Sequence, residues 1–167
     1  MMDIDALIIE LIEFGRRATD EELSQIVAHV AQAPFASRLV RISPRLRDAF
    51  AAALGTPVPR RLPSIEFHLL KRIHLEQQWP VGTTARQYVT ELHLAVRHPA
   101  ARIWTYEYRT EPMVGFLAPS QVQNAPQPEA FVFVAYNARY GAITTGFQAS
   151  GPGAIFGKEY QRLMQHR

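Results

Sequence analysis

Residues 101–108, with the sequence ARIWTYEY, decide the fold class, because the spacing of apolar residues changes there from a helical period to alternation. The large aromatic side chains fall on one face of the expected strand: Trp104, Tyr106 and Tyr108. Three further strand-like runs follow: residues 112–118, 130–136 and 142–149. The segment FVFVA at 131–135 lacks a polar face, so we expect it to be a central strand of the sheet.

Two helices are expected just before these strands. The first begins near Ile65 and ends where the sequence WPVG, at 79–82, breaks the helical pattern. The second starts at a capping box formed by Thr84 and Gln87 and ends near residue 97. Two helices followed by four antiparallel strands predict an α+β fold, in which two helices pack on a four-stranded antiparallel sheet.

Three more helices are expected near the N-terminus. The first covers about residues 3–17, where apolar residues recur at helical spacing. The second follows a capping box of Thr19 and Glu22, and the third follows Ser43 as its N-cap. Together they predict a small three-helix N-terminal unit over residues 1–55.

The segment GTPVPRRLPS at 55–64 is rich in proline and arginine, which is typical of a stiff, extended connector. We therefore expect a helical unit at 1–55, a linker at 56–64 and an α+β domain at 65–167. The tail of that domain, residues 156–167, is expected to form a last short helix.

Composition is that of a globular chain. Hydrophobic residues make up 47% and charged residues 20%, which is enough for a buried core. No apolar run approaches the length of a membrane span, and the start is acidic before it is apolar, the reverse of a secretory signal. The absence of cysteine removes disulfides, thiolate catalysis and zinc–thiolate sites. We expect a cytoplasmic protein that does not associate with a membrane.

The charges are unevenly distributed. Residues 1–55 hold six arginines and eight acids, whereas residues 56–167 hold twelve cations and seven acids. The later part is therefore net positive by five charges, which favours an anionic partner. Sixteen of the eighteen cations are arginine, whose planar donor fork suits phosphate.

Residues 65–78, IEFHLLKRIHLEQQ, bring four chemistry-bearing side chains within two turns of one helix: His68, Lys71, Arg72 and His74. RNA cleavage by attack of the neighbouring 2′-hydroxyl needs an acid, a base and a cation over the charge that develops on phosphorus. The two histidines point in different directions, and we favour His68 because Arg72 lies one turn beyond it. The same pattern is also typical of a solvated basic helix with one partly buried histidine.

Hydroxyl and loop residues complete the candidates. Thr144 and Thr145 are adjacent on a strand, so only one of them is expected to face a site, where it can bind a phosphoryl oxygen or hold the base. Arg139 and Tyr140 lie in a loop and are candidate contacts to phosphate and base. The acids are scattered and no HExxH pair is present, so no metal or other cofactor is expected.

The order of these parts resembles the barnase–EndoU–colicin–RelE-like nuclease superfamily, and within it the phage-associated branch. Three motifs carry the resemblance: H-x-x-K-R-x-H in the first helix of the domain, P-x-G-T-T-x-x-x-Y at the start of the second, and T-T-G-F in the last strand. It covers about residues 63–150 and omits the N-terminal unit. The resemblance implies a metal-independent endoribonuclease of toxin or phage-effector type that acts on cellular RNA, especially tRNA.

The residues that match the superfamily's positions are His68, Lys71, Arg72 and His74 on the helix and Thr144 or Thr145 on the last strand. The resemblance implies that one histidine is the general acid or base, that Arg72 and Lys71 bind phosphate, and that Thr145 assists by hydrogen bonding. RNA is the expected partner, with a neutralising protein as a second. The alternative is a catalytically inactive module that binds protein or nucleic acid through the same basic and aromatic surface.

Overall fold

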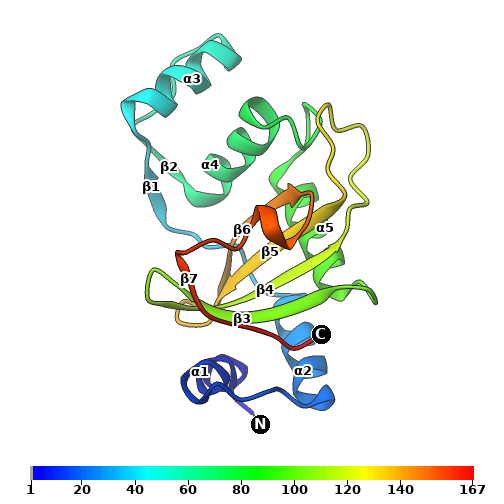
Figure 1. Ribbon diagram of the computed structural model, residues 1–167. Helices are drawn as coiled ribbons and strands as arrows, with labels where there is room; N and C mark the ends of the chain where they lie inside the picture. Colours follow the sequence, from blue (N-terminus) through cyan, green and yellow to red (C-terminus); the bar gives the residue numbers. More distant parts are fainter. Residues whose placement is uncertain (1) are drawn as a thin grey trace.

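A five-stranded antiparallel sheet organises residues 2–167, which the computed structural model describes (Figure 1). In spatial order its strands are β6 (Ala142–Ala149), β5 (Phe131–Asn137), β4 (Glu111–Pro119), β3 (Arg102–Tyr108) and β7 (Tyr160–Gln165). The four expected strands are confirmed, and the apolar strand β5 has a paired neighbour on each side.

The C-terminal tail adds the fifth strand, so the short helix expected over residues 156–167 is wrong. Strand β7 pairs with β3, with Tyr160 opposite Tyr108 and Gln165 opposite Trp104. The tail sequence YQRLMQ consists mostly of helix-forming residues, but β3 offers an unpaired strand edge. Backbone pairing with that edge overrides the local preference.

The helices begin and end close to the expected positions. In chain order they are α1 (Ile4–Phe14), α2 (Asp20–Val30), α3 (Pro44–Leu54), α4 (Ser64–Leu70) and α5 (Ala85–Arg97). The capping boxes of Thr19 with Glu22 and of Thr84 with Gln87 are both formed, and Ser43 caps α3. Helix α4 continues as a π-helical turn, η1 (Lys71–Leu75), and a single turn of 3₁₀ helix, η2 (Pro152–Ala154), precedes β7. No helix within residues 2–167 is long and apolar enough to cross a membrane.

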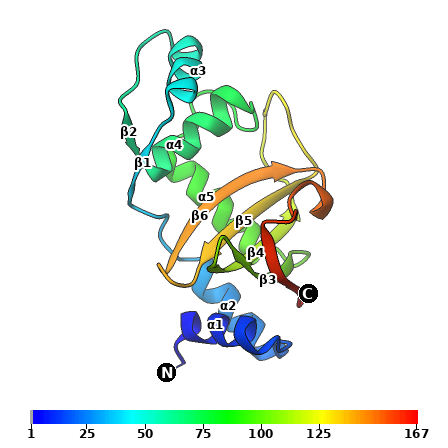
Figure 2. The ribbon, with the colours of Figure 1, turned by 60° about the vertical axis from the view of Figure 1, so that its left-hand side comes forward.

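The first three helices do not form the expected three-helix unit. Helices α1 and α2 lie at one end of the molecule, where α1 packs on β3 and β4 and α2 packs on α5 (Figures 1 and 2). Helix α3 lies at the opposite end, against η1, and buries Phe50 with Ile42 and Leu62. Between these ends the chain forms a two-stranded ribbon of β1 (Leu39–Arg41) and β2 (Arg61–Pro63). The apolar sheet offers α1 a larger surface to bury than another short helix can.

The sheet has two apolar faces. The face toward α1, α2 and α5 contributes Ile103, Val114 and Val134 to the main core. The other face carries an aromatic cluster that includes Trp104 and Phe133. Because successive residues of a strand point to opposite sides, the aromatic alternation of residues 101–108 is explained by this second face. This face carries the candidate site.

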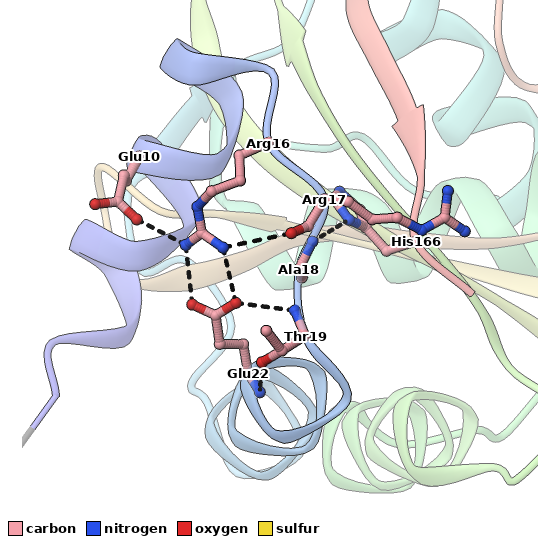
Figure 3. A network of polar contacts seen from close by, with 7 residues as sticks. All are labelled: Glu10, Arg16, Arg17, Ala18, Thr19, Glu22 and His166. Carbon is pink, nitrogen blue, oxygen red and sulfur yellow. Dashed lines mark hydrogen bonds and ion pairs between the residues drawn. The ribbon is translucent and has the colours of Figure 1, made fainter.

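Polar contacts join the turn between α1 and α2 to His166, near the C-terminus (Figure 3), and His166 in turn contacts β3. The backbone N–H of Ala18 donates to Nδ1 of His166 at 3.1 Å, and Nε2 of His166 lies 2.7 Å from the hydroxyl of Thr105. Because Nδ1 accepts a hydrogen bond, Nε2 carries the proton and donates it to Thr105. Beside this contact, both Nη atoms of Arg16 bind Glu22 at 2.9 Å. The turn between α1 and α2 is thereby fixed to the C-terminal strand.

Candidate functional site: a cleft on the open face of the sheet

A cleft of about 390 Å³ lies on the aromatic face of the sheet. One wall comes from α4 and η1, which contribute His68, Lys71 and Arg72. The floor is formed by side chains of the sheet: Tyr106, Tyr108, Met113, Phe133, Phe147 and Tyr160. Four cations and a single carboxylate line the cleft: Arg38, Lys71, Arg72, Arg109 and Glu111. The cleft therefore combines positive charge with aromatic surface.

Three of the predicted residues form a chain of hydrogen bonds in this cleft. Arg72 donates from Nη2 to the hydroxyl of Thr145 at 2.8 Å, and the same hydroxyl lies 3.3 Å from Nδ1 of His68. A hydroxyl has two acceptor lone pairs and one donor, so Thr145 can accept from both neighbours or donate to His68. The hydroxyl thus links the cation to the imidazole and orients the ring.

The side chain of Arg72 is fixed by three polar partners and one aromatic ring. It is 4% exposed, donates from Nε to the carbonyl of Gly146 at 2.7 Å, and forms an ion pair from Nη1 with Glu76. Its guanidinium lies over the ring of Phe147, with Cζ 5.3 Å from the ring centroid. The π-helical turn that carries Arg72 is a departure from α-helical geometry that frequently marks functional sites.

The glycine of the TTGF sequence is required by packing. A Cβ atom at Gly146 would lie 2.3 Å from the side chain of Leu92 on α5. The carbonyl of Gly146 accepts hydrogen bonds from Arg72 and from the hydroxyl of Tyr88, the tyrosine of the P-x-G-T-T-x-x-x-Y sequence. The three sequence motifs therefore meet at one residue of β6.

His68 is packed between aromatic rings and is neutral at neutral pH. Its ring centroid lies 5.6 Å from that of Phe35 and 5.3 Å from that of Phe67. Burial, and after it the nearby positive charges of Arg72, Lys71 and Arg38, together lower the pKa of His68 to about 3. The imidazole is therefore available as a proton acceptor but not as a cation.

Both threonines of β6 line the cleft, so the expectation that only one could face a site is wrong. Strand β6 has a bulge here: Ala135 pairs with Thr145, whereas the next residue of β5, Tyr136, pairs with Ile143. Thr144 is the extra residue. A bulge re-aims side chains that would otherwise alternate, and it occurs often beside active sites.

The remaining predicted residues are more widely placed. Lys71 lines the wall of the cleft beside His68, and Tyr140 lies at the opposite rim, 58% exposed. Arg139 pairs through Nε with Glu111 at 3.4 Å, and among the described residues neither it nor His74 lines the cleft. The structure thus brings together His68, Lys71, Arg72, Thr144, Thr145 and Tyr140.

Arg38 and Arg109, which line the cleft, and Phe35, which packs on His68 behind it, were not predicted from the sequence. Arg38 and Phe35 come from the segment before β1, which crosses to the edge of β6, where Phe35 forms a bridge with Ile143. Arg109 stands on a two-residue hairpin turn in which both residues, Arg109 and Thr110, have positive φ angles of 49° and 68°. No local pattern marks these residues, because tertiary contacts alone bring Arg38 and Arg109 to the cleft and Phe35 to His68.

No family model matches this chain, and neither a curated protein nor a solved structure matches it. Within residues 2–167, no group of three or more His, Cys, Asp or Glu side chains could hold a metal ion. The assignment of a function therefore depends on the geometry and charge of the cleft.

Proposed function

We propose that the cleft is the active site of a metal-independent endoribonuclease that cleaves RNA by attack of the 2′-hydroxyl. The observation that carries the proposal is the convergence of His68, Thr145 and Arg72, which come from distant parts of the chain, in one basic cleft. A neutral imidazole oriented by a hydroxyl and set beside a fixed guanidinium is a suitable arrangement for proton transfer at a phosphodiester.

His68 acts as the general base. The competent tautomer carries its proton on Nδ1 and donates it to the Thr145 hydroxyl, which leaves Nε2 free to accept the proton of the 2′-hydroxyl. Thr145 is a positioning residue in this scheme. The leaving 5′-oxygen takes its proton from solvent, since the rim of the cleft is exposed at Arg38 and Tyr140.

Arg72 and Lys71 stabilise the negative charge that develops on the phosphate oxygens. Three of the five N–H donors of Arg72 are used by Gly146, Thr145 and Glu76, so two remain for an oxyanion. Because these contacts fix the guanidinium before substrate binds, little reorganisation accompanies the reaction.

The resemblance to the barnase–EndoU–colicin–RelE-like superfamily supports a toxin or phage-effector role, with tRNA as the narrower substrate and a neutralising protein as a partner. The same proposal places the protein in the cytoplasm, where such RNA is found. The region of resemblance, 63–150, contains the catalytic residues of the proposal but not Arg38 or Phe35. The proposed site therefore extends beyond the common module.

The proposal is tested by incubating the purified protein with total RNA in the presence of a chelator. We expect fragments that end in 2′,3′-cyclic phosphate, and we expect His68→Gln and Arg72→Lys to lose activity while the exposed control Arg97→Gln keeps it. His74→Ala separates the two histidines and is expected to remain active. Absence of cleavage by the wild type, or equal cleavage by His68→Gln, contradicts the proposal.

The pH profile is a second test. A base with a pKa of about 3 in the free protein stays deprotonated across the acidic range, so kcat/KM is expected to show no decline attributable to His68 between neutral pH and pH 5. A decline with a midpoint near the ordinary histidine value, absent in His74→Ala, would instead assign the base to His74.

The second candidate is a catalytically inactive RNA-binding module that uses the same cleft. One observation favours it: His68 is packed against Phe35 and Phe67, and a pKa of about 3 makes it a weak base. Salt-sensitive RNA binding by a wild-type protein that leaves RNA intact is the result expected for this candidate.

A further inference from the structure

The charge of the N-terminal region is separated into two parts. Residues 2–37 hold two arginines and seven acids, whereas residues 38–61 hold six arginines and one acid, Asp48. We call residues 38–61 the arginine arm; it comprises β1, α3 and the connection to β2. The arm lies at the opposite end of the molecule from α1 and α2 (Figures 1 and 2). Residues 38–61 thus carry a net charge of five positive units, equal and opposite to that of residues 2–37.

The arginines of the arm are not neutralised by the protein. Elsewhere in the chain five arginines form ion pairs with glutamate: Arg16, Arg72, Arg109, Arg139 and Arg162. Among residues 2–167 no ion pair involves an arginine of the arm: Arg38, Arg41, Arg45, Arg47, Arg60 and Arg61. The side-chain N–H groups of the exposed arginines in the arm are therefore free to bind an external anion.

The ribbon sets two of these charges against each other. Arg41 lies directly opposite Arg61 in the antiparallel pairing of β1 and β2. Like charges in this position destabilise a strand pair. The register cannot slip to relieve the repulsion, because Leu62, on the other face, is buried against Ile42 and Phe50. An anion bound between the two guanidinium groups removes the repulsion and satisfies both donor forks.

The arm is continuous with the cleft. Arg38 immediately precedes β1 and lines the cleft, and its carbonyl accepts a hydrogen bond from the N–H of Ser64 at the start of α4. A strand rises by about 3.3 Å per residue, so Arg41 lies about 10 Å further along the ribbon. The free cations of the arm thus begin at the cleft and continue outward along the ribbon.

We propose that the arginine arm binds the phosphate backbone of the RNA strand that extends beyond the cleft, so that the substrate is an RNA of many nucleotides. This inference rests on the proposed function in taking the occupant of the cleft to be RNA. A polynucleotide matches unpaired arginines spread along an extended segment, since it presents a phosphate at each nucleotide. Arginine is also common in protein interfaces, so an acidic protein is the competing occupant that the experiment must separate from RNA.

The test compares the double variant Arg41→Gln/Arg61→Gln with the matched control Arg86→Gln/Arg97→Gln, which removes two exposed cations from α5. Binding is measured by fluorescence anisotropy with 2′-O-methyl RNA, which has no free 2′-hydroxyl to react. The probes are a strand of about 20 nucleotides and one of about four, which is short enough to occupy only the cleft. Each titration is repeated at several salt concentrations.

We expect the double variant to bind the long strand more weakly, with a salt-dependence slope smaller by about 1.4, because about 0.7 is lost for each phosphate contact to a single strand. Its affinity for the short strand is expected to match that of the wild type, and the control variant is expected to keep both. The double variant should melt at the same or a higher temperature, since it loses a like-charge contact.

Each other outcome has a defined meaning. An unchanged slope for the long strand, or an equal loss for both strands, overturns the role of the arm, as does tighter binding of poly-glutamate than of RNA by the wild type. If the wild type binds long RNA through the arm but leaves unmodified RNA intact, the arm is supported and the endoribonuclease function alone fails. If the double variant cleaves long RNA with an unchanged kcat/KM, the arm fails while the function stands.

Discussion

Arg72 in the cleft and Arg41 on the ribbon carry the same side chain in opposite surroundings. Arg72 is buried and binds a backbone carbonyl, a hydroxyl and a carboxylate, whereas Arg41 is exposed and faces another arginine. The first has most of its donors satisfied by the protein, and the second has none satisfied by an acid of the described chain. Arg72 therefore has a structural role in addition to the one proposed for it at the site, whereas Arg41 is available to a ligand alone.

The comparison shows why the two regions need different experiments. A substitution at Arg72 removes the cation proposed to bind phosphate and also a connection between η1 and β6, so its effect on activity includes an effect on stability. A substitution at Arg41 changes the surface without removing a contact that the fold needs. Binding at the arm can therefore be measured separately from stability, and binding in the cleft cannot.

The largest effect is expected for Arg72→Ala. The substitution leaves Glu76 without its partner and removes two hydrogen bonds that hold β6, so we expect the free energy of unfolding to fall by about 3 kcal/mol. Urea unfolding measures this difference. The exposed control Arg97→Ala should change stability by less than about 0.5 kcal/mol. A loss for Arg72→Ala as small as that of the control would show that the buried contacts do not stabilise the fold.

The next effect is the pH dependence that His68 imposes. Its pKa is near 6.5 in the unfolded chain and about 3 in the folded protein, so between these values only the unfolded chain binds the proton. The stabilising contribution of the neutral His68 is therefore fully present above pH 6.5. The free energy of unfolding falls as the pH is lowered, by about 2 kcal/mol between pH 7 and pH 5. His166, whose pKa is also lowered by burial, adds to the loss in the same direction.

His68→Gln isolates this contribution, because glutamine does not titrate. Urea unfolding at pH 7 and at pH 5 is expected to show a smaller pH-dependent loss in the variant by about 2 kcal/mol. The quantity to compare is the change in unfolding free energy between pH 7 and pH 5 in each protein, and not the stability of the variant at either pH. An equal pH-dependent loss in both proteins would mean that His68 is protonated as readily in the fold as outside it.

The smallest effect is expected on the ribbon. Arg41→Gln removes the like-charge contact with Arg61 and should stabilise the protein by about 0.2–1 kcal/mol. Because the repulsion is between exposed charges, the gain should shrink as salt is added. Thermal unfolding at low and high salt measures it, with Arg86→Gln as the control. Destabilisation at low salt would indicate that Arg41 makes a contact on which the ribbon depends.

The starts of several helices were predictable because the signals for them are local. The capping residues Thr19, Ser43 and Thr84 each act on the backbone N–H groups of their own helix, and a sequence displays them directly. The association of the three helices was not predictable in the same way. Whether α1 packs on α3 or on the sheet depends on the apolar area that each surface offers, and that area exists only in the assembled fold.

The C-terminal tail and the cleft also contain features that local sequence could not predict. Residues 160–165 become a strand because the edge of β3 is unpaired, and nothing within the tail signals that edge. Thr144 reaches the cleft through a bulge in β6, which no pattern of two adjacent threonines reveals. Arg38 reaches it because the segment before β1 crosses to the edge of β6.

The sequence by itself determined the α+β class, the limits of most helices and strands, and the cluster of His68, Lys71 and Arg72 on one helix, because each follows from spacing along the chain. Only the tertiary structure decided that Thr145 joins Arg72 to His68, that burial makes this histidine neutral, and that the arginine arm stands free of acidic partners. These properties depend on distances between segments far apart in the chain, and such distances are set by packing and not by local sequence.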